Sequence, residues 1–446
     1  MVIYNNLMHY DIIIIGSGPA GLFAAYNLIE KGIKNILIVD RNKFPSGGLL
    51  NDCKLNLTSE IGMDINDLYL SKEEADAYIQ YIDNIFLDFG ASREVYGLDE
   101  SKYMEWVRRA QRNDVVLLPA KQRHIGTDMS KEIINKFREY LENMGVSFSL
   151  GFEVKGIKSD GVTHEVTDGM NNHTSDNMII APGRWGAKWL REISDELGIK
   201  FTNGKRIDAG IRIEMKKESY PITDILYDPK FKIKTKYGSS VRTFCTNPGG
   251  RVRLEHYDQF KLINGDALKG YKTENTNFAL LNTIELTEPL TDPFVFGRLI
   301  ASMTNILGGG KPVIQRMGDF LDEKRSKMTT FNDSSRWFDK LTPTLSTGSL
   351  VEPGDIRMVY PYKIVKSLKE ALIKLNKVFD NTILKEENLI YAPEIKFYSF
   401  SYETDKYMMT NIEGIFVAGD GAGKSRGIVG AAISGMLAAK GIAERR

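Results

Sequence analysis

The stretch YDIIIIGSGPAGLFAAYNLIEKGIKNILIVD, residues 10–40, decides the fold of the first part of this chain. It opens with a short β-branched apolar run, Ile12 to Ile15, of the kind that forms a strand buried on both faces of a parallel sheet. A glycine-rich turn and a segment with small residues at helical spacing follow, and a second apolar run ends in Asp40. This order predicts a strand–helix–strand unit.

The glycine-rich turn has the pattern G-x-G-x-x-G, formed by Gly16, Gly18 and Gly21. The first glycine permits a tight turn, the second lets a pyrophosphate approach the backbone, and the third lets the helix pack closely on the strand. The N-terminus of the helix can face the phosphates, and Asp40 can accept hydrogen bonds from ribose hydroxyls. Because all these parts occur in the required order and spacing, the sequence predicts a dinucleotide site rather than a structural unit with incidental glycines.

Composition limits the classes of protein that the chain can be. Its 446 residues are enough for two or three domains, and its net charge of +1 provides no basic excess for binding a nucleic-acid backbone. The two cysteines, Cys53 and Cys245, form no C-x-x-C motif, which suits a reducing cytosol and gives no zinc signature. Ordinary thiols are favoured over a redox pair between them.

The longest apolar runs are also informative. No stretch of about 18 uninterrupted apolar residues occurs, and no basic segment precedes the apolar run at Ile12. We therefore expect a cytoplasmic protein with no transmembrane segment, a small-molecule substrate and no nucleic-acid partner.

The middle of the chain has a different pattern from its start. Residues 208–215, DAGIRIEM, alternate like a half-buried strand, and further strand-like runs predict an antiparallel sheet with helices. We predict helices over residues 101–111, as part of the first domain, and over residues 313–327. A strand over residues 394–401 is predicted to return the chain to the first domain.

These patterns predict an α/β protein of two domains. A Rossmann-like domain with a parallel sheet is expected to be discontinuous, formed by residues 1–200 and 390–446. Residues 201–389 are expected to form an inserted α+β substrate domain.

A second glycine-rich motif lies near the C-terminus, in TNIEGIFVAGDGAGKSRGIVGAAISG, residues 410–435. A buried strand is predicted to end at Gly419 and Asp420, and a helix with small residues follows. The acid can bind a sugar hydroxyl, and the helix N-terminus can face an anionic group. The segment AGDGAGKS also fits a P-loop with its first glycine replaced, but nucleotide hydrolysis would leave the N-terminal motif unexplained.

Three motifs together resemble the flavoproteins of the glutathione-reductase-type FAD fold: GSGPAG through Asp40, MIIAPGRWG at 178–186 and GIFVAGDGAG at 414–423. More closely, the chain resembles the uncharacterised FAD-dependent dehydrogenases of bacteria and archaea. The segments that carry this resemblance are GGLLNDCKLNLTSEIG, RHIGTD, FCTNPGGRV, NTNFALL and AGDGAGKSRGIVGAAISG, which span most of the chain. Cys53 stands where members commonly have a small residue.

The resemblance implies FAD as the cofactor and indicates the residues that contact it. These are Gly16, Gly18, Pro19, Ala20, Gly21, Asp40, Arg41, Gly48, Val154, Ala181, Gly183, Gly419, Asp420 and Gly427. Only one complete dinucleotide fingerprint is present, so NADH or NADPH, if used, is a transient electron donor without a domain of its own. The implied function is an FAD-dependent oxidoreductase that transfers hydride between the flavin and a small organic substrate.

Three side chains are candidates for catalysis: His124, Arg184 and Cys245. His124 is the candidate proton donor beside a flavin, and the alternative is a surface or hydrogen-bonded loop histidine. Arg184 can bind an anionic substrate or merely flank the cofactor. Two other functions stay open, an FAD-dependent monooxygenase and a flavoprotein with a non-redox or RNA-related role. The sequence predicts neither the substrate nor the oligomeric state.

Overall fold

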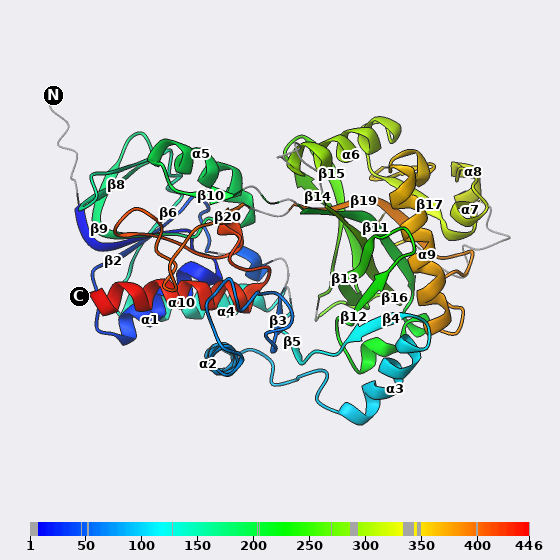
Figure 1. The fold of residues 1–446 in the computed structure, drawn as a ribbon, viewed down its shortest axis with the longest axis horizontal. Helices are drawn as coiled ribbons and strands as arrows, with labels where there is room; N and C mark the ends of the chain where they lie inside the picture. The colour runs from blue at the N-terminus through cyan, green and yellow to red at the C-terminus, as the bar shows by residue number, and fades with distance from the viewer. Residues whose placement is uncertain are drawn as a thin grey trace. The chain divides into compact units, whose positions relative to one another are not determined.

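The computed structural model describes residues 8–45, 47–50, 53–126, 128–202, 204, 206–268, 270–285, 293–332, 343–345, 349–397 and 400–445. The chain divides into two compact units (Figure 1). Unit 1 consists of Met1–Glu94, Arg123–Gly204 and Ser399–Arg446, and unit 2 consists of Val95–Gln122 and Lys205–Tyr398. Each unit has its own buried hydrophobic core.

Unit 1 is built on a parallel sheet, as the first apolar runs predict. Its five parallel strands are β6 (Ser147–Leu150), β2 (Ile36–Asp40), β1 (Met8–Ile15), β9 (Asn172–Ile180) and β21 (Ile415–Val417), in that spatial order. Strands β7 (Gly156–Ser159) and β8 (His164–Thr167) extend the sheet in antiparallel fashion from the first half of β9. The C-terminal halves of the central strands, Ile12–Ile15 of β1 and Met178–Ile180 of β9, are apolar and buried, as is typical of strands covered on both faces.

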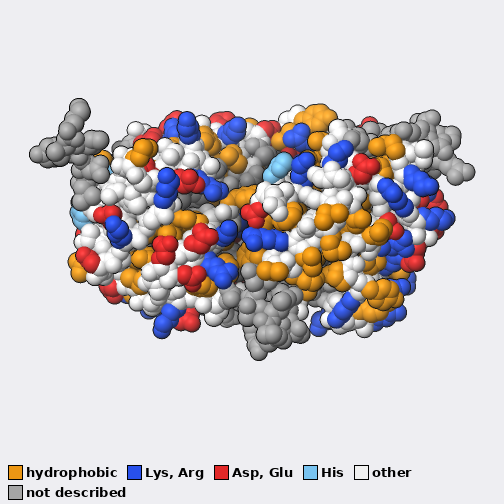
Figure 2. Space-filling model, turned by 90° about the horizontal axis from the view of Figure 1, so that it is seen from above, with side chains coloured by type: hydrophobic (Ala, Val, Ile, Leu, Met, Phe, Trp, Pro, Cys, Tyr) orange, Lys and Arg blue, Asp and Glu red, His pale blue; other side chains and the backbone are white. Residues whose placement is uncertain are grey.

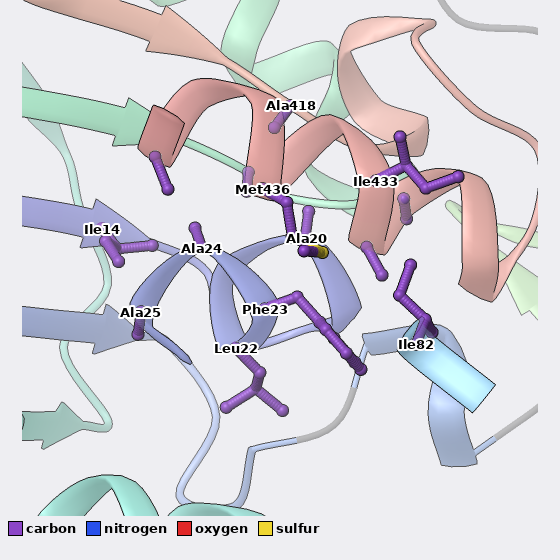
Figure 3. Packing of buried hydrophobic residues seen from close by; sticks show 14 of the residues in the cluster. Ile14, Ala20, Leu22, Phe23, Ala24, Ala25, Ile82, Ala418, Ile433 and Met436 are labelled. Carbon is purple, nitrogen blue, oxygen red and sulfur yellow. The ribbon is translucent and has the colours of Figure 1, made fainter. Parts of the chain in front are cut away.

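Helices α1 (Pro19–Glu30) and α10 (Ile428–Arg445) lie side by side in this unit (Figure 1). A Cβ atom added to Gly435 would lie 2.0 Å from the Ala20 carbonyl oxygen, so only glycine permits so close a crossing. Figure 3 shows Ala20 and Ala24 on the side of α1 that faces α10, whereas Leu22 points away. The predicted small-residue packing of the last helix is confirmed.

The other elements of unit 1 complete its core. Helix α2 (Lys72–Asp88) begins at a capping box between Ser71 and Glu74, and α4 (Ser130–Asn143) and α5 (Ala187–Leu197) follow further along the chain. The Phe23 ring packs against Phe86 and Phe137, with centroid separations of 5.4 and 5.1 Å. Two small sheets pair β3 (Lys54–Asn56) with β5 (Gln122–His124) and β10 (Phe201–Thr202) with β20 (Ser401–Tyr402).

Unit 2 contains the predicted antiparallel sheet. Its spatial order is β18 (Glu352–Pro353), β17 (Val313–Arg316), β19 (Leu389–Phe397), β11 (Arg206–Lys216), β16 (Asn275–Glu285), β13 (Ser240–Pro248), β12 (Lys230–Lys234) and β4 (Val115–Leu118). Among the described strands of this sheet, only β17 and β18 pair in parallel. A separate hairpin joins β14 (Arg251–Tyr257) and β15 (Phe260–Asp266). The helices are α3 (Glu100–Gln111), α6 (Pro293–Leu307), α7 (Met317–Leu321), α8 (Met328–Asn332) and α9 (Tyr362–Val378).

Two predicted elements are corrected by the structure. The helix expected over 313–327 is wrong, because Val313 and Ile314 form strand β17 beside β19 and helix α7 starts only at Met317. The strand expected to return the chain to the first domain starts earlier, at Leu389, and pairs with β11 inside unit 2. In both cases pairing with a distant strand decides the structure of a short apolar run.

The unit boundaries differ from the expected ones in two places. Residues 95–122, with α3, belong to unit 2, because β4 pairs with β12. Residues 390–398 also belong to unit 2, because β19 lies between β11 and β17. Unit 1 is discontinuous, and it is formed by three stretches of the chain where two were expected.

The surface has mixed charge. Figure 2 shows Lys and Arg side chains interspersed with Asp and Glu over the visible face. Within the described ranges, no helix combines the length and the hydropathy needed to cross a bilayer. No group of three or more His, Cys, Asp or Glu residues in the same ranges could hold a metal ion.

Candidate cofactor-binding site

The three glycine-containing motifs meet at one edge of the unit 1 sheet. Strands β1, β9 and β21 are parallel, so Gly16, Ala181 and Gly419, which follow them, lie at the same edge. A Cβ atom on Gly16 would lie 2.2 Å from the Ala181 carbonyl oxygen, and one on Gly421 would lie 2.4 Å from the Gly183 carbonyl oxygen. The structure therefore brings together the motifs that the sequence separates by more than 160 and 200 residues.

Helix α1 begins at this edge with uncapped backbone donors. Gly18 is its N-cap and Pro19 its first residue, and no side chain caps the first turn or adds an acid to it. A helix N-terminus with buried, uncapped N–H groups is an anion site, since these donors and the helix dipole both favour negative charge. A Cβ on Gly18 would lie 3.3 Å from the Gly47 Cα, so the segment carrying Gly48 runs beside the turn. These residues fit the pyrophosphate of a dinucleotide.

Asp40 lies at the end of β2, as predicted, but its carboxylate already accepts four hydrogen bonds. Oδ2 accepts from the Ser17 backbone N–H at 2.8 Å and from Ser17 Oγ at 2.5 Å. Oδ1 accepts from the Asn42 N–H at 2.8 Å and from Asn42 Nδ2 at 3.0 Å. A carboxylate offers about four lone-pair sites. A ribose hydroxyl bound to Asp40 would have to replace one of these donors. Ser17 and Asn42, which the sequence interpretation missed, therefore belong to the candidate site.

The second acid of the site, Asp420, is paired with the predicted Arg184. The Arg184 Nε lies 3.4 Å from Asp420 Oδ2, and Ser425 Oγ donates a hydrogen bond to Asp420 Oδ1. Arg184 is half exposed while Asp420 is largely buried. The loop that carries Asp420 is held by a hydrogen bond of 2.8 Å from the Gly419 N–H to Ser434 Oγ of α10.

The remaining predicted contacts lie in the same unit. Arg41 is exposed directly after Asp40, and Val154 is buried in the segment between β6 and β7, in which the Gly151 N–H donates to the Asp40 carbonyl oxygen at 2.8 Å. Gly427 precedes α10, and a Cβ on it would lie 3.6 Å from the Gly62 Cα. A Cβ on Gly48 or on Gly183 would meet no atom within 4 Å, so there is open space beside both backbones.

The two other catalytic candidates, His124 and Cys245, lie in different units. His124 is buried, at 5% exposure, on strand β5 of unit 1, so it is not a surface loop residue. Cys245 lies in unit 2, at an irregularity in strand β13 where its backbone has a φ of +48°. Neither cysteine forms a disulfide.

Cys245 lies beside a buried ion pair that sequence patterns did not reveal. The Arg212 guanidinium donates to both Glu394 oxygens, at 2.6 and 2.7 Å, and to the Cys245 carbonyl oxygen at 3.1 Å. Both charged side chains are fully buried. Burial lowers the pKa of Arg212, but the attraction of Glu394 outweighs it and holds that pKa above the ordinary value.

Replacing Asp40 with Ala is expected to weaken FAD binding roughly 10- to 100-fold, since hydrogen bonds to a charged group are lost. Asp40→Asn, which keeps an acceptor oxygen, should lose less. Fluorescence titration of the apoprotein with FAD measures both, and the Asp176→Ala variant, exposed on the same sheet, is the matched control. Unchanged affinity in Asp40→Ala would remove this residue from the site.

Comparisons with known proteins agree with this geometry. Residues 9–178 match a family model described as FAD binding domain, and residues 208–396 match one described as FAD-dependent protein, C-terminal domain-like. An uncharacterized protein of Clostridium beijerinckii is 24% identical over 470 residues, covering 97% of this chain and 80% of that protein. The dinucleotide predicted from the sequence is therefore FAD.

The chain also has low similarity to several solved structures. Glycine oxidase from Geobacillus kaustophilus has a TM-score of 0.43 at 12% identity, over 98% of this chain and 95% of that one. The 3-ketosteroid-delta4-(5alpha)-dehydrogenase from Rhodococcus jostii RHA1 has a TM-score of 0.45 at 10% identity, over 99% and 98%. Similarity at this level concerns the course of the chain alone.

Proposed function

We propose that this FAD-dependent oxidoreductase transfers hydride between FAD, held by unit 1, and a small organic substrate. The observation that carries the proposal is the edge of the unit 1 sheet, where the uncapped N-terminus of α1 and the turns at Gly16, Gly183 and Gly419 meet. FAD supplies the hydride chemistry, and the protein supplies binding, orientation and charge. The N-terminus of α1 holds the phosphates, while Asp40 and Asp420 hold sugar hydroxyls.

His124 is proposed as the proton donor. Its strand, β5, pairs with β3, and the Ile125 N–H donates to the Cys53 carbonyl oxygen at 2.9 Å. Cys53 Sγ in turn donates to the Leu49 carbonyl oxygen at 2.9 Å, in the segment that lies beside the Gly18 turn. His124 is thus fixed on a segment that adjoins the cofactor site, which favours a positioned acid–base group. We assign Arg184 to orienting Asp420, its ion-pair partner, rather than to binding substrate.

Buried polar side chains of unit 2 bear on the kind of ligand that this unit would take. Asp208, Arg212 and Glu214 lie on one face of β11, and all three are fully buried. Buried polar groups normally satisfy each other, and Arg212 does so. In contrast, Asn277 Nδ2 and Arg253 Nε are buried and bond to no other described residue. Two such donors favour a ligand of unit 2 that carries oxygen acceptors, such as a carboxylate or carbonyl.

The number of dinucleotide fingerprints and the two cysteines bear on the electron donor and on the cellular location. Only one complete dinucleotide fingerprint occurs in the sequence, so NADH or NADPH is proposed to bind transiently. Two cysteines without a disulfide are in keeping with the reducing cytoplasm, which we propose as the location.

Anaerobic mixing of the FAD-loaded protein with NADH or with NADPH tests the function. We expect one of the two to bleach the flavin absorption, and an organic acceptor to restore it. Replacing His124 with Gln should slow reoxidation by the substrate roughly 100-fold while leaving FAD binding unchanged. Loss of the acidic or basic limb of the rate's pH profile in this variant would identify the proton donor. Turnover only with oxygen, with hydroxylated product, would instead favour the monooxygenase alternative.

A further inference from the structure

Lys424 occupies an unusual position beside the cofactor site. It follows Asp420 in the loop between β21 and α10, and its backbone N–H donates to the Gly419 carbonyl oxygen at 3.2 Å. Its neighbour Ser425 donates to the carboxylate of Asp420. The loop is packed tightly at Gly423, where a Cβ would lie 2.1 Å from the Phe400 carbonyl oxygen. The backbone of Lys424 is therefore fixed next to a group that is assigned to hold the cofactor.

The side chain of Lys424 is buried without a direct ion pair in the described ranges. It is 6% exposed, and its Nζ makes no hydrogen bond or ion pair with any residue in the described ranges. Two other lysines with similar burial are paired: Lys230 Nζ lies 2.6 Å from Asp228, and Lys396 Nζ lies 3.2 Å from Glu394. Burial lowers the pKa of Lys424, and the carboxylate of Asp67 offsets this only in part.

An ammonium group buried in this way is unfavourable unless an anion compensates it. The local acids do so only in part: Asp67 does not fully offset the effect of burial, and Asp420 is paired with Arg184 and Ser425. The ligand expected at this edge of the sheet, FAD, carries two anionic groups at neutral pH: its pyrophosphate and, once reduced by two electrons, its ring system. Either would give Lys424 the partner that its protein surroundings lack.

We propose that Lys424 is a cationic contact for an anionic group of FAD. The proposal rests on the assignment of the FAD site to unit 1, and it adds a residue and a role that the glycine motifs do not imply. It also explains why a lysine is tolerated in a loop that otherwise consists of small residues, A-G-D-G-A-G-K-S. The neutral but polar Gln side chain should bind the same anion less well.

The test compares wild type with Lys424→Gln, Lys424→Arg and Lys440→Gln, the last being an exposed lysine of α10 in the same unit. Titrations with FAD and with ADP measure the two dissociation constants, and dye equilibration measures the midpoint potential of the bound flavin. Thermal unfolding without FAD reports on a purely structural role, since removing an unpaired buried charge should not destabilise the protein.

If Lys424 binds the pyrophosphate, Lys424→Gln should weaken FAD and ADP binding alike, roughly 10-fold. If Lys424 binds the reduced ring, Lys424→Gln should bind oxidised FAD as tightly as wild type does. Its midpoint potential should fall by about 30 mV if Lys424 favours reduced over oxidised flavin 10-fold. Lys424→Arg should retain most of either effect. The proposal would be overturned if Lys424→Gln had the same dissociation constants and midpoint potential as Lys440→Gln. It would also be overturned if the only effect of Lys424→Gln were a lower thermal stability of the FAD-free protein. If the wild-type protein does not bind FAD, the assignment of the FAD site is wrong as well. This outcome differs from failure of the Lys424 proposal alone, in which the wild-type protein binds FAD and the substitution has no effect.

Discussion

Replacing Arg212 with Met is expected to lower the free energy of unfolding of unit 2 by about 3–5 kcal/mol, because the buried Glu394 then loses both hydrogen bonds from Arg212 and keeps only Lys396 as an ion-pair partner. Arg212 and Glu394 are both fully buried and joined by two hydrogen bonds, at 2.6 and 2.7 Å. Arg212 also donates to Asn277 Oδ1 at 2.7 Å, so its removal breaks a connected network across β19, β11 and β16. Denaturant unfolding followed by circular dichroism measures the loss.

Two controls distinguish the effect of leaving a buried charge without its partner from the effect of losing an exposed ion pair. Arg206 lies on β11, like Arg212, and forms an ion pair with Glu285 of β16. Both side chains are more than half exposed, so Arg206→Met is expected to lower the free energy of unfolding by less than about 1 kcal/mol. The double variant Arg212→Met/Glu394→Met should regain much of the stability, since both charges of the pair are removed and the buried Lys396, which loses Glu394, still has Glu255 at 3.6 Å. A loss in Arg212→Met no larger than in Arg206→Met would contradict this account of unit 2.

Replacing Gly16 with Ala is expected to abolish FAD retention and to destabilise unit 1. The backbone of Gly16 has a φ of +104°, which an L side chain tolerates only with strain of about 1–3 kcal/mol. The added Cβ would also lie 2.2 Å from the Ala181 carbonyl oxygen, which adds an overpacking cost of about 1–3 kcal/mol. Relief of this clash must separate β1 from β9 at the edge where the cofactor motifs meet.

Gly161→Ala is the matched control for this prediction. Gly161 has a similar φ of +89°, but it lies in the turn between β7 and β8, and a Cβ there would meet no atom within 4 Å. This variant therefore has the conformational strain without the clash. We expect it to lose modest stability and to keep its FAD. Equal FAD loss in both variants would show that general destabilisation, and not the geometry at Gly16, removes the cofactor.

The parts of the fold that the sequence predicts are those controlled by local chemistry. The strand at Ile12, the turn at Gly16 and the helix that follows are specified within about 20 residues by periodicity and by glycine. The edge at which Gly16, Ala181 and Gly419 meet was also predictable, because parallel strands align the residues that follow them.

The parts that the sequence does not predict depend on distant partners. Val313 and Ile314 fit a helix or a strand equally well as a short apolar run, and only pairing with Ala392 and Tyr391 decides between them. The Arg212–Glu394 pair joins residues 182 positions apart, so no local pattern indicates it. The saturation of Asp40 by Ser17 and Asn42 likewise depends on side-chain geometry.

The binding stoichiometry of FAD tests the central claim most directly. Purified full-length protein, stripped of flavin and reconstituted with FAD, should retain about one FAD per chain after gel filtration, with a flavin absorption spectrum. The same protocol applied to Gly16→Ala should yield protein without flavin, and applied to Gly161→Ala should yield the wild-type ratio. Wild-type protein that is folded and retains no FAD under these conditions would contradict the assignment of the site.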